Sequence, residues 1–144
     1  MRISGEPDEL NAGAGAPGAG VPMNDKRLLI IDDEREIGEF IRTVAEDMGF
    51  AVTVTASADE FQAAYASFNP THIMLDIVMP DIDGIELLRD LAKRGCQAKV
   101  LVMSGYSEKY LDSAEKLSDA YGLRNIDRIT KPIRLGKLRE VLAA

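Results

Sequence analysis

The run Leu28-Leu29-Ile30-Ile31-Asp32-Asp33 decides the fold of this chain, because four large apolar residues are followed at once by two carboxylates. Three further apolar stretches also end in a polar residue: Asp76 follows residues 73–75, Ser104 follows residues 100–103, and Lys131 follows residues 126–130. A short continuous apolar run predicts a strand of a parallel sheet that is buried on both faces. Because ligands bind outside the carboxyl ends of such strands, we expect these polar side chains to gather at one crevice.

Helical patterns alternate with these runs along the chain. Apolar residues recur at helical spacing on one face of the first predicted helix: Ile37, Phe40, Ile41, Val44 and Met48. Gly49 is typical of the residue that ends a helix, and Ser57 with Glu60 predicts a capping box at the start of the second helix. The other expected elements are strands at 27–31, 50–55, 71–75, 98–103 and 126–130, a loop at 76–83, and helices at 84–94, 107–121 and beyond 132. Five β–α repeats predict an α/β fold with helices on both faces of a parallel sheet.

Composition narrows the classes of partner. The net charge is −7 over 144 residues, whereas a surface that binds nucleic acid would show a basic stripe, so we expect neither nucleic acid nor a membrane as partner. Cys96 is the only cysteine, which excludes an internal disulfide and favours a reducing compartment. No apolar stretch approaches the length of a transmembrane helix, and the chain lacks the start of a signal peptide. We therefore expect a cytoplasmic protein.

The first 25 residues differ from the rest of the chain. They are rich in Gly, Ala and Pro and contain few large apolar side chains, so we expect residues 1–25 to be a disordered tail and residues 26–144 to form one domain. Residues 13–18 match the pattern GxGxxG. That pattern carries no weight here, because no strand precedes it and no helix follows it.

Asp32, Asp33 and Asp76 are expected to crowd negative charge at the crevice. Like charges this close are stable only when a cation joins them. No cluster of His or Cys accompanies them, so the oxygen donors favour Mg²⁺. A carboxylate can attack phosphorus itself and form an aspartyl phosphate, with Lys131 supplying a positive charge and Ser104 a hydroxyl group. The residues therefore predict a cation-assisted phosphoryl acceptor.

From residue 26 onward the sequence resembles the receiver domain of two-component response regulators. The resemblance rests on four motifs in order: the pair Asp32-Asp33, residues 75–80 with Asp83-Gly84 following, Ser104-Gly105, and Thr130-Lys131-Pro132. It implies a flavodoxin-like, doubly wound, five-stranded parallel sheet of strand order 2-1-3-4-5 with five helices. It also implies a signalling protein that is not an enzyme, except that it catalyses its own phosphorylation and slow autodephosphorylation.

The same resemblance implies roles for individual residues. Asp76 is similar to the phosphorylated aspartate of the family, and Lys131 to the lysine that pairs with the phosphoryl group. Asp33 and Asp32, with Asp76 and the backbone carbonyl of Val78, correspond to the Mg²⁺ ligands. Ser104 corresponds to the hydroxyl residue that turns toward the phosphoryl group, and the Lys131-Pro132 peptide bond is often cis in the family.

Two departures from the family pattern concern the switch that reports phosphorylation. Receivers usually carry an aromatic residue three positions before the lysine, and this chain has Arg128 there. We expect the aromatic role to be absent or transferred to Tyr106 or Tyr110. The stretch between Ser104 and Lys131 also looks several residues longer than usual, which predicts an extended fourth helix or loop.

Several residues have a second interpretation. Asp81-Ile82-Asp83-Gly84 resembles the nucleophile motif of haloacid-dehalogenase-type phosphatases, but Pro80 separates it from the preceding strand. His72 lies at the start of a predicted strand, where a structural role is favoured over phosphotransfer. The pair Asp32-Asp33 could instead cap the first helix, where carboxylates favour the positive end of the helix dipole.

The favoured functional hypothesis is a stand-alone receiver that is phosphorylated on Asp76 by a histidine kinase or a histidine phosphotransfer protein. Its output would be phosphorylation-dependent binding to a downstream protein, since the chain ends with the fifth helix and shows no output domain. One alternative is a phosphate sink for a shared kinase, which a short phosphoryl lifetime would reveal. Another is an adaptor that binds its partner regardless of phosphorylation. The sequence leaves open whether the chain pairs as a homodimer through its fourth helix and fifth strand.

Overall fold

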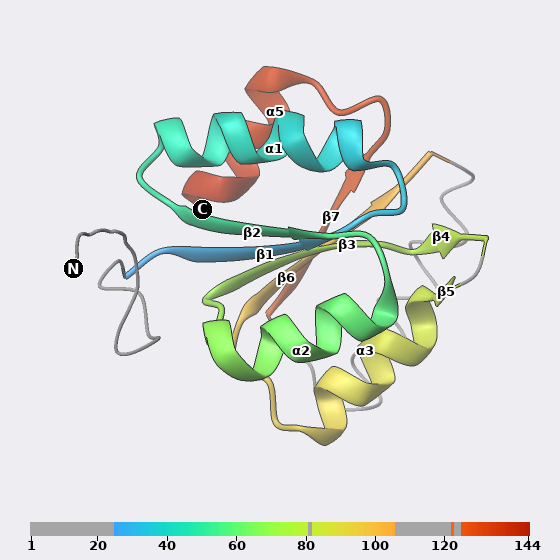
Figure 1. Ribbon diagram of the computed structural model, residues 1–144. Helices are drawn as coiled ribbons and strands as arrows, with labels where there is room; N and C mark the ends of the chain where they lie inside the picture. The colour runs from blue at the N-terminus through green and yellow to red at the C-terminus, as the bar shows by residue number, and fades with distance from the viewer. Residues whose placement is uncertain (1–24, 81, 106–121, 123–124) are drawn as a thin grey trace.

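The computed structural model describes residues 25–80, 82–105, 122 and 125–144, drawn in colour in Figure 1. The helix expected at 107–121 lies outside the described residues, as do Tyr106 and Tyr110. Within the described part of the chain, no helix is long and apolar enough to cross a membrane.

Five parallel strands form the central sheet. They are β1 (Arg27–Ile31), β2 (Ala51–Thr55), β3 (His72–Asp76), β6 (Lys99–Ser104) and β7 (Ile126–Thr130). Their order is β2-β1-β3-β6-β7, which is the predicted order 2-1-3-4-5 of a doubly wound sheet. The fold class is therefore confirmed, and the carboxyl ends of all five strands lie along one edge of the sheet.

Helices cover both faces of the sheet. Figure 1 shows α1 (Arg35–Asp47) and α5 (Leu135–Ala143) on one face, and α2 (Ala58–Phe68) and α3 (Gly84–Lys93) on the other. The described residues thus contain four of the five expected helices, and the fifth, expected at 107–121, lies outside them. This layering buries both sides of the three inner strands β1, β3 and β6, which explains their long apolar runs, whereas the edge strands β2 and β7 are only half-buried and carry polar residues.

The apolar core is divided by the sheet into two layers. Successive side chains of a strand point to opposite faces. Leu28 and Ile30 accordingly pack against α1 and α5, whereas Leu29 and Ile31 pack on the side of α2 and α3. All four are fully buried. The alternation continues past the ends of the strands and determines which polar side chains share a side of the sheet at the crevice.

The predicted helix ends are largely confirmed, with one difference in bonding. Gly49 has a positive φ of 92°, as expected for the residue after a helix. The Ser57 side chain accepts a hydrogen bond from the Glu60 backbone N–H at 3.2 Å and so caps α2. The Glu60 carboxylate returns to the N–H of Ala56, not to that of Ser57. Both free N–H groups are still satisfied by reciprocal bonds.

The buried face of α1 is narrower than predicted, because Phe40 is not part of it. Its side chain is 41% exposed, although Ile41 and Val44 beside it are buried. The helix contacts the sheet along a stripe narrower than the five apolar residues suggested, so Phe40 lies at its margin and faces solvent.

The segment at 76–83, expected as a loop, contains a small antiparallel hairpin. Its strands are β4 (Val78–Met79) and β5 (Ile82–Asp83), with Val78 opposite Asp83. Asp83 then caps α3 by accepting a hydrogen bond from the Ile85 N–H at 2.9 Å. The next residue, Gly84, fits so closely that an added Cβ would lie 2.7 Å from the backbone of Ile77. The hairpin thus ties the residues after Asp76 to the start of α3.

Candidate phosphoryl-acceptor site

Backbone hydrogen bonds hold the crevice residues at the ends of their strands. The Asp32 N–H donates to the Thr55 carbonyl at 3.2 Å, and Asp76 is the last residue of β3, paired with Met103. The Lys131 N–H donates to the Ser104 carbonyl at 2.9 Å. By the alternation of side chains, Asp32 follows Ile30, and Asp76 follows Met74, onto the side of the sheet that faces α1 and α5. This shared side explains why these two carboxylates meet.

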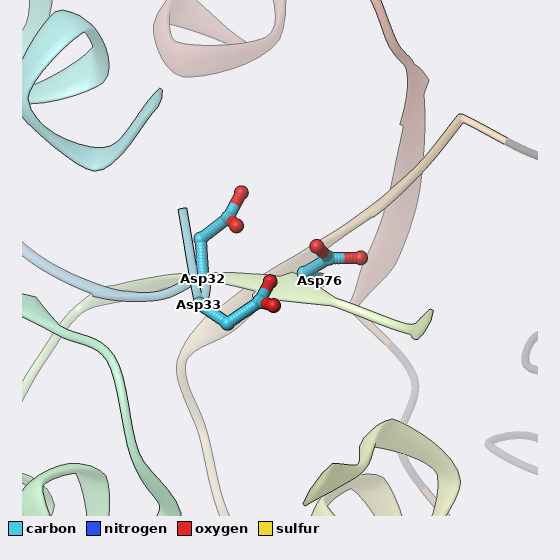
Figure 2. A group of neighbouring side chains, drawn as sticks. All are labelled: Asp32, Asp33 and Asp76. Atoms are coloured by element: carbon cyan, nitrogen blue, oxygen red, sulfur yellow. The ribbon is translucent and has the colours of Figure 1, made fainter. Parts of the chain in front are cut away.

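Three aspartates form a cluster that is able to hold a metal ion. Asp32, Asp33 and Asp76 each offer a carboxylate oxygen, and these oxygens all lie within 4.8 Å of one another. Figure 2 shows the three side chains together at the edge of the sheet. Asp32 and Asp76 are buried, whereas Asp33 is exposed. Two buried carboxylates beside a third open to solvent form a site with hard oxygen ligands that remains accessible from water.

The donor set fits a divalent cation of the magnesium type. Asp32 Oδ1 accepts a hydrogen bond from the Glu34 N–H at 2.9 Å. Its other oxygen, Oδ2, is buried and accepts no well-aligned hydrogen bond from any described residue. A buried oxygen of this kind, beside two further carboxylates, is what a hard cation requires.

Lys131 supplies positive charge to this cluster. Its ammonium nitrogen lies 2.8 Å from Asp76 Oδ2 and 3.0 Å from Asp32 Oδ2. A third carboxylate, that of Glu34, lies 3.5 Å from the same nitrogen. The Lys131 side chain is 14% exposed, so these ion pairs are poorly screened by water. One ammonium group therefore partly neutralises the two buried carboxylates.

The electrostatics of the buried groups reflect this crowding. Burial raises the pKa of Asp32 to about 6, with the charge of Asp76 adding to the effect and the contacts from Glu34 and Lys131 opposing it. Burial alone would lower the pKa of Lys131. Its hydrogen bond to Asp76 and its close contact with Asp32, together with the charges of both carboxylates, outweigh burial and hold that pKa above its ordinary value. Lys131 is thus an ammonium ion throughout the physiological range.

Glu34 is a site residue that the sequence reasoning missed. Asp32 fixes its position through the bond to the Glu34 N–H, and Glu34 is the N-cap residue of α1. Asp32-Asp33 therefore do not occupy the cap position that we considered for them. The sequence does show Glu34 as a third consecutive acidic residue after β1. Its contact with Lys131 depends on the fold, because Lys131 follows β7, which lies at the edge of the sheet and is not a neighbour of β1.

The remaining predicted site residues are placed as follows. Ser104 is fully buried at the end of β6, and Gly105 after it lies against the Lys131 side chain, where a Cβ would come within 3.4 Å of Lys131 Cβ. Val78 lies in β4, two residues beyond Asp76. Arg128 lies within β7, and the Lys131-Pro132 peptide bond is cis, as the resemblance indicated.

Two residues with a second interpretation, His72 and Asp83, have structural roles outside the acidic cluster. His72 begins β3 at the opposite edge of the sheet, where its Nδ1 is 2.9 Å from Thr71 Oγ1 and its ring meets Phe50 edge-on. Burial lowers its pKa, with smaller effects from Lys99 and Lys26. This environment agrees with the structural role expected for it. Asp83, part of the phosphatase-like motif, caps α3 with its carboxylate.

An apolar hollow adjoins the acidic cluster. We call it the α1 hollow; its volume is about 230 Å³, and it is lined by Glu36, Ile37, Phe40, Lys131, Pro132 and Ile133. The exposed Phe40 and the exposed Leu135, 48% accessible at the start of α5, lie on the two helices of this face. Because Lys131 contributes to both, the hollow and the acidic cluster share a boundary.

Comparison with known proteins agrees with this geometry. A family model for the response regulator receiver domain matches residues 28–143. The regulator of RpoS from Escherichia coli (strain K12) is 29% identical over 124 residues, which cover 85% of this chain and 35% of that protein. The KDP operon transcriptional regulatory protein KdpE of the same strain is 33% identical over 112 residues, which cover 78% of this chain and 47% of that protein. The chain thus spans between a third and a half of the length of these relatives.

Solved structures of response regulators share this fold. The crystal structure of a response regulator from Colwellia psychrerythraea superposes with a TM-score of 0.69 at 33% identity, covering 82% of this chain and 94% of that one. A CheY-like receiver domain from Methanospirillum hungatei JF-1 gives a TM-score of 0.70 at 28% identity. The fold and the acidic edge define a signalling domain of two-component systems. The chain belongs to the response regulator receiver domain family.

Proposed function

We propose that this chain accepts a phosphoryl group on Asp76 in a reaction that depends on Mg²⁺. The observation that carries the proposal is the position of the Lys131 ammonium, 2.8 Å from the carboxylate of Asp76 in a pocket with two further aspartates. Asp76 is buried at the end of β3, so its carboxylate is held in one place at the edge of the sheet. Phosphoryl transfer requires mainly such positioning and neutralisation of charge.

In the proposed reaction, a carboxylate oxygen of Asp76 forms a bond to phosphorus while the bond from phosphorus to the donor breaks. The donor group leaves as the histidine imidazole of a protein, or as acetate when the donor is acetyl phosphate. Lys131 provides a positive charge for the transferred oxygens, and the Ser104 hydroxyl, at the end of β6, would bond one of them. A bound Mg²⁺, held by Asp32, Asp33 and Asp76 with the Val78 carbonyl, would neutralise further charge on the phosphoryl group.

The donor is proposed to be a histidine kinase or a histidine phosphotransfer protein that covers the α1 hollow. This hollow is apolar, carries the exposed ring of Phe40 and adjoins the acceptor through Lys131. A donor protein that reaches Asp76 must cover the surface beside it, and exposed apolar residues there favour association. Phe40→Ala is therefore expected to slow transfer from a phosphohistidine protein while leaving uptake from acetyl phosphate unchanged.

The output is proposed to be phosphorylation-dependent binding to a downstream protein. The experiment that tests the acceptor role is intact mass spectrometry after incubation with acetyl phosphate, with and without Mg²⁺, on wild type and Asp76→Asn. We expect one phosphoryl addition that requires both Mg²⁺ and Asp76. Addition that persists in Asp76→Asn would place the phosphoryl group elsewhere. The decay of the added mass then separates a signalling receiver from a phosphate sink, which should lose the group quickly.

A further inference from the structure

The side chain of Glu34 contacts Lys131 and does not cap α1, the helix that follows it. Glu34 occupies the N-cap of α1, a position where Ser, Thr, Asp and Asn are preferred because their short side chains reach back to the helix N–H groups. Its side chain makes no capping hydrogen bond. It extends instead to the Lys131 ammonium, with Oε1 at 3.5 Å from the nitrogen. The identity of this residue is therefore not explained by helix capping.

The position of Lys131 creates a conflict at the cation site. The ammonium lies on Asp32 Oδ2 and on Asp76 Oδ2, and these two residues also belong to the cluster that is able to hold a metal ion. A divalent cation and an ammonium on the same two carboxylates repel each other strongly in a poorly hydrated pocket. The cation therefore binds more tightly when the ammonium has another carboxylate to occupy.

Glu34 meets the requirements of that alternative partner. Its carboxylate already contacts the ammonium, and its side chain is 63% exposed, so it does not belong to the buried pair. The backbone of Lys131 is fixed by its bond to the Ser104 carbonyl, and Gly105 presents no Cβ to the lysine side chain. The ammonium can thus shift toward Glu34 by rotation of its own side chain, without movement of the sheet.

We propose that Glu34 is a positioning residue that receives the Lys131 ammonium when a cation occupies Asp32 and Asp76. Glu34 thereby increases the affinity of the acidic cluster for Mg²⁺ through the lysine, without itself serving as a ligand. The inference deepens the proposed function, because it assigns a further residue to the same site and rests on that site binding Mg²⁺.

Glu36 provides a matched control for simple loss of charge. It is an exposed glutamate in the first turn of α1, two residues from Glu34. Within the described part of the chain, Glu36 forms no ion pair with Lys131. Glu36 lines the α1 hollow together with Lys131, but only Glu34 pairs with the ammonium. Glu34→Gln and Glu36→Gln therefore remove the same charge from the same end of the helix, and only the first removes an ion pair with the lysine.

The test is a Mg²⁺ titration of the purified protein, followed by backbone amide resonances, in five variants and wild type. The variants are Glu34→Gln, Glu36→Gln, Lys131→Met, and each glutamate variant combined with Lys131→Met. We expect Glu34→Gln to weaken Mg²⁺ binding about threefold more than Glu36→Gln, in the range of an exposed ion pair. In the Lys131→Met background the two glutamate variants should be equal, because the ammonium that Glu34 receives is gone.

Three results would overturn the inference. One is an equal effect of the two glutamate variants when Lys131 is present. Another is an extra effect of Glu34→Gln that persists in Lys131→Met, since Glu34 would then act on the cation directly. The third is wild-type protein that binds no Mg²⁺. Phosphoryl uptake from acetyl phosphate, measured by mass in the same samples, tests the proposed function separately, because the titration needs no phosphoryl transfer.

Discussion

The Lys131 ammonium lies 2.8 Å from Asp76 Oδ2, although the two residues lie at the ends of strands that are not neighbours in the sheet. Asp76 ends β3, Lys131 follows β7, and β6 lies between them. The lysine side chain therefore passes over the end of β6, where Gly105 lies against it. This contact joins two distant parts of the chain at the proposed acceptor, and it determines how the site responds to substitution.

Replacing Lys131 by Met should destabilise the metal-free protein. The two buried carboxylates would lose the cation that both of them contact, and removal of one partner from a buried ion pair is strongly unfavourable. We expect the free energy of unfolding in EDTA, measured by urea titration, to fall by about 2 kcal/mol. Lys137→Met removes an exposed lysine of α5 and should change it by less than about 0.5 kcal/mol. Equal effects of the two variants would contradict the central role of the ammonium.

Asp32→Asn should stabilise the metal-free protein at neutral pH. The pKa of Asp32 is raised from 3.8 to about 6 by burial, so its ionisation lowers stability as the pH rises through that range. Asparagine does not ionise, so we expect the free energy of unfolding of the variant to exceed that of the wild type by on the order of 1–2 kcal/mol at pH 7. This difference should shrink as the pH is lowered from 7 toward 4. Asp47→Asn, at an exposed position, should show no comparable pH dependence.

The affinity of the wild type for Mg²⁺ should fall in mild acid. A proton on Asp32 competes with the cation, and the pKa of about 6 places that competition just below neutral pH. Binding at pH 5 is expected to be about tenfold weaker than at pH 7, as one displaced proton requires. Calorimetric titrations at a series of pH values measure this directly. An affinity that stays constant between pH 7 and pH 5 would show that Asp32 remains ionised.

Gly84→Ala should perturb the acceptor from a distance. An added Cβ would lie 2.7 Å from the Ile77 backbone and 3.0 Å from the Asp76 carbonyl, so the start of α3 or the residues after Asp76 must shift. We expect a loss of about 2 kcal/mol in stability, together with slower uptake from acetyl phosphate. Gly136→Ala is the matched control, because nothing lies within 4 Å of its added Cβ. Since alanine favours the helix more than glycine does, the free energy of unfolding should rise by up to about 1 kcal/mol. If Gly84→Ala changed neither stability nor uptake, the contact of Gly84 with the Ile77 backbone would be looser than these distances imply.

Much of the fold could be predicted because the strands are strongly patterned. The expected bounds 27–31 and 126–130 coincide with β1 and β7, and the crevice residues lie at the strand ends where they were expected. The same two-residue period could also have placed Asp32 and Asp76 on one side of the sheet.

The differences have local physical causes. The hairpin of β4 and β5 has two residues in each strand, too few for any alternation to be visible in the sequence. Phe40 has the correct spacing for a buried face but lies at the margin of the contact between α1 and the sheet. Glu34 depends on a partner 97 positions away, a relationship that no local pattern reveals.

Lys131 also lines the α1 hollow, so one side chain is part of two surfaces. Free energies of binding at the two surfaces are then coupled, and the coupling acts equally in both directions. If a cation or a phosphoryl group at the acidic cluster changes how tightly a protein holds the hollow, that protein must change the affinity of the cluster by the same factor. A partner bound over Phe40 would then regulate the acceptor as well as respond to its phosphorylation.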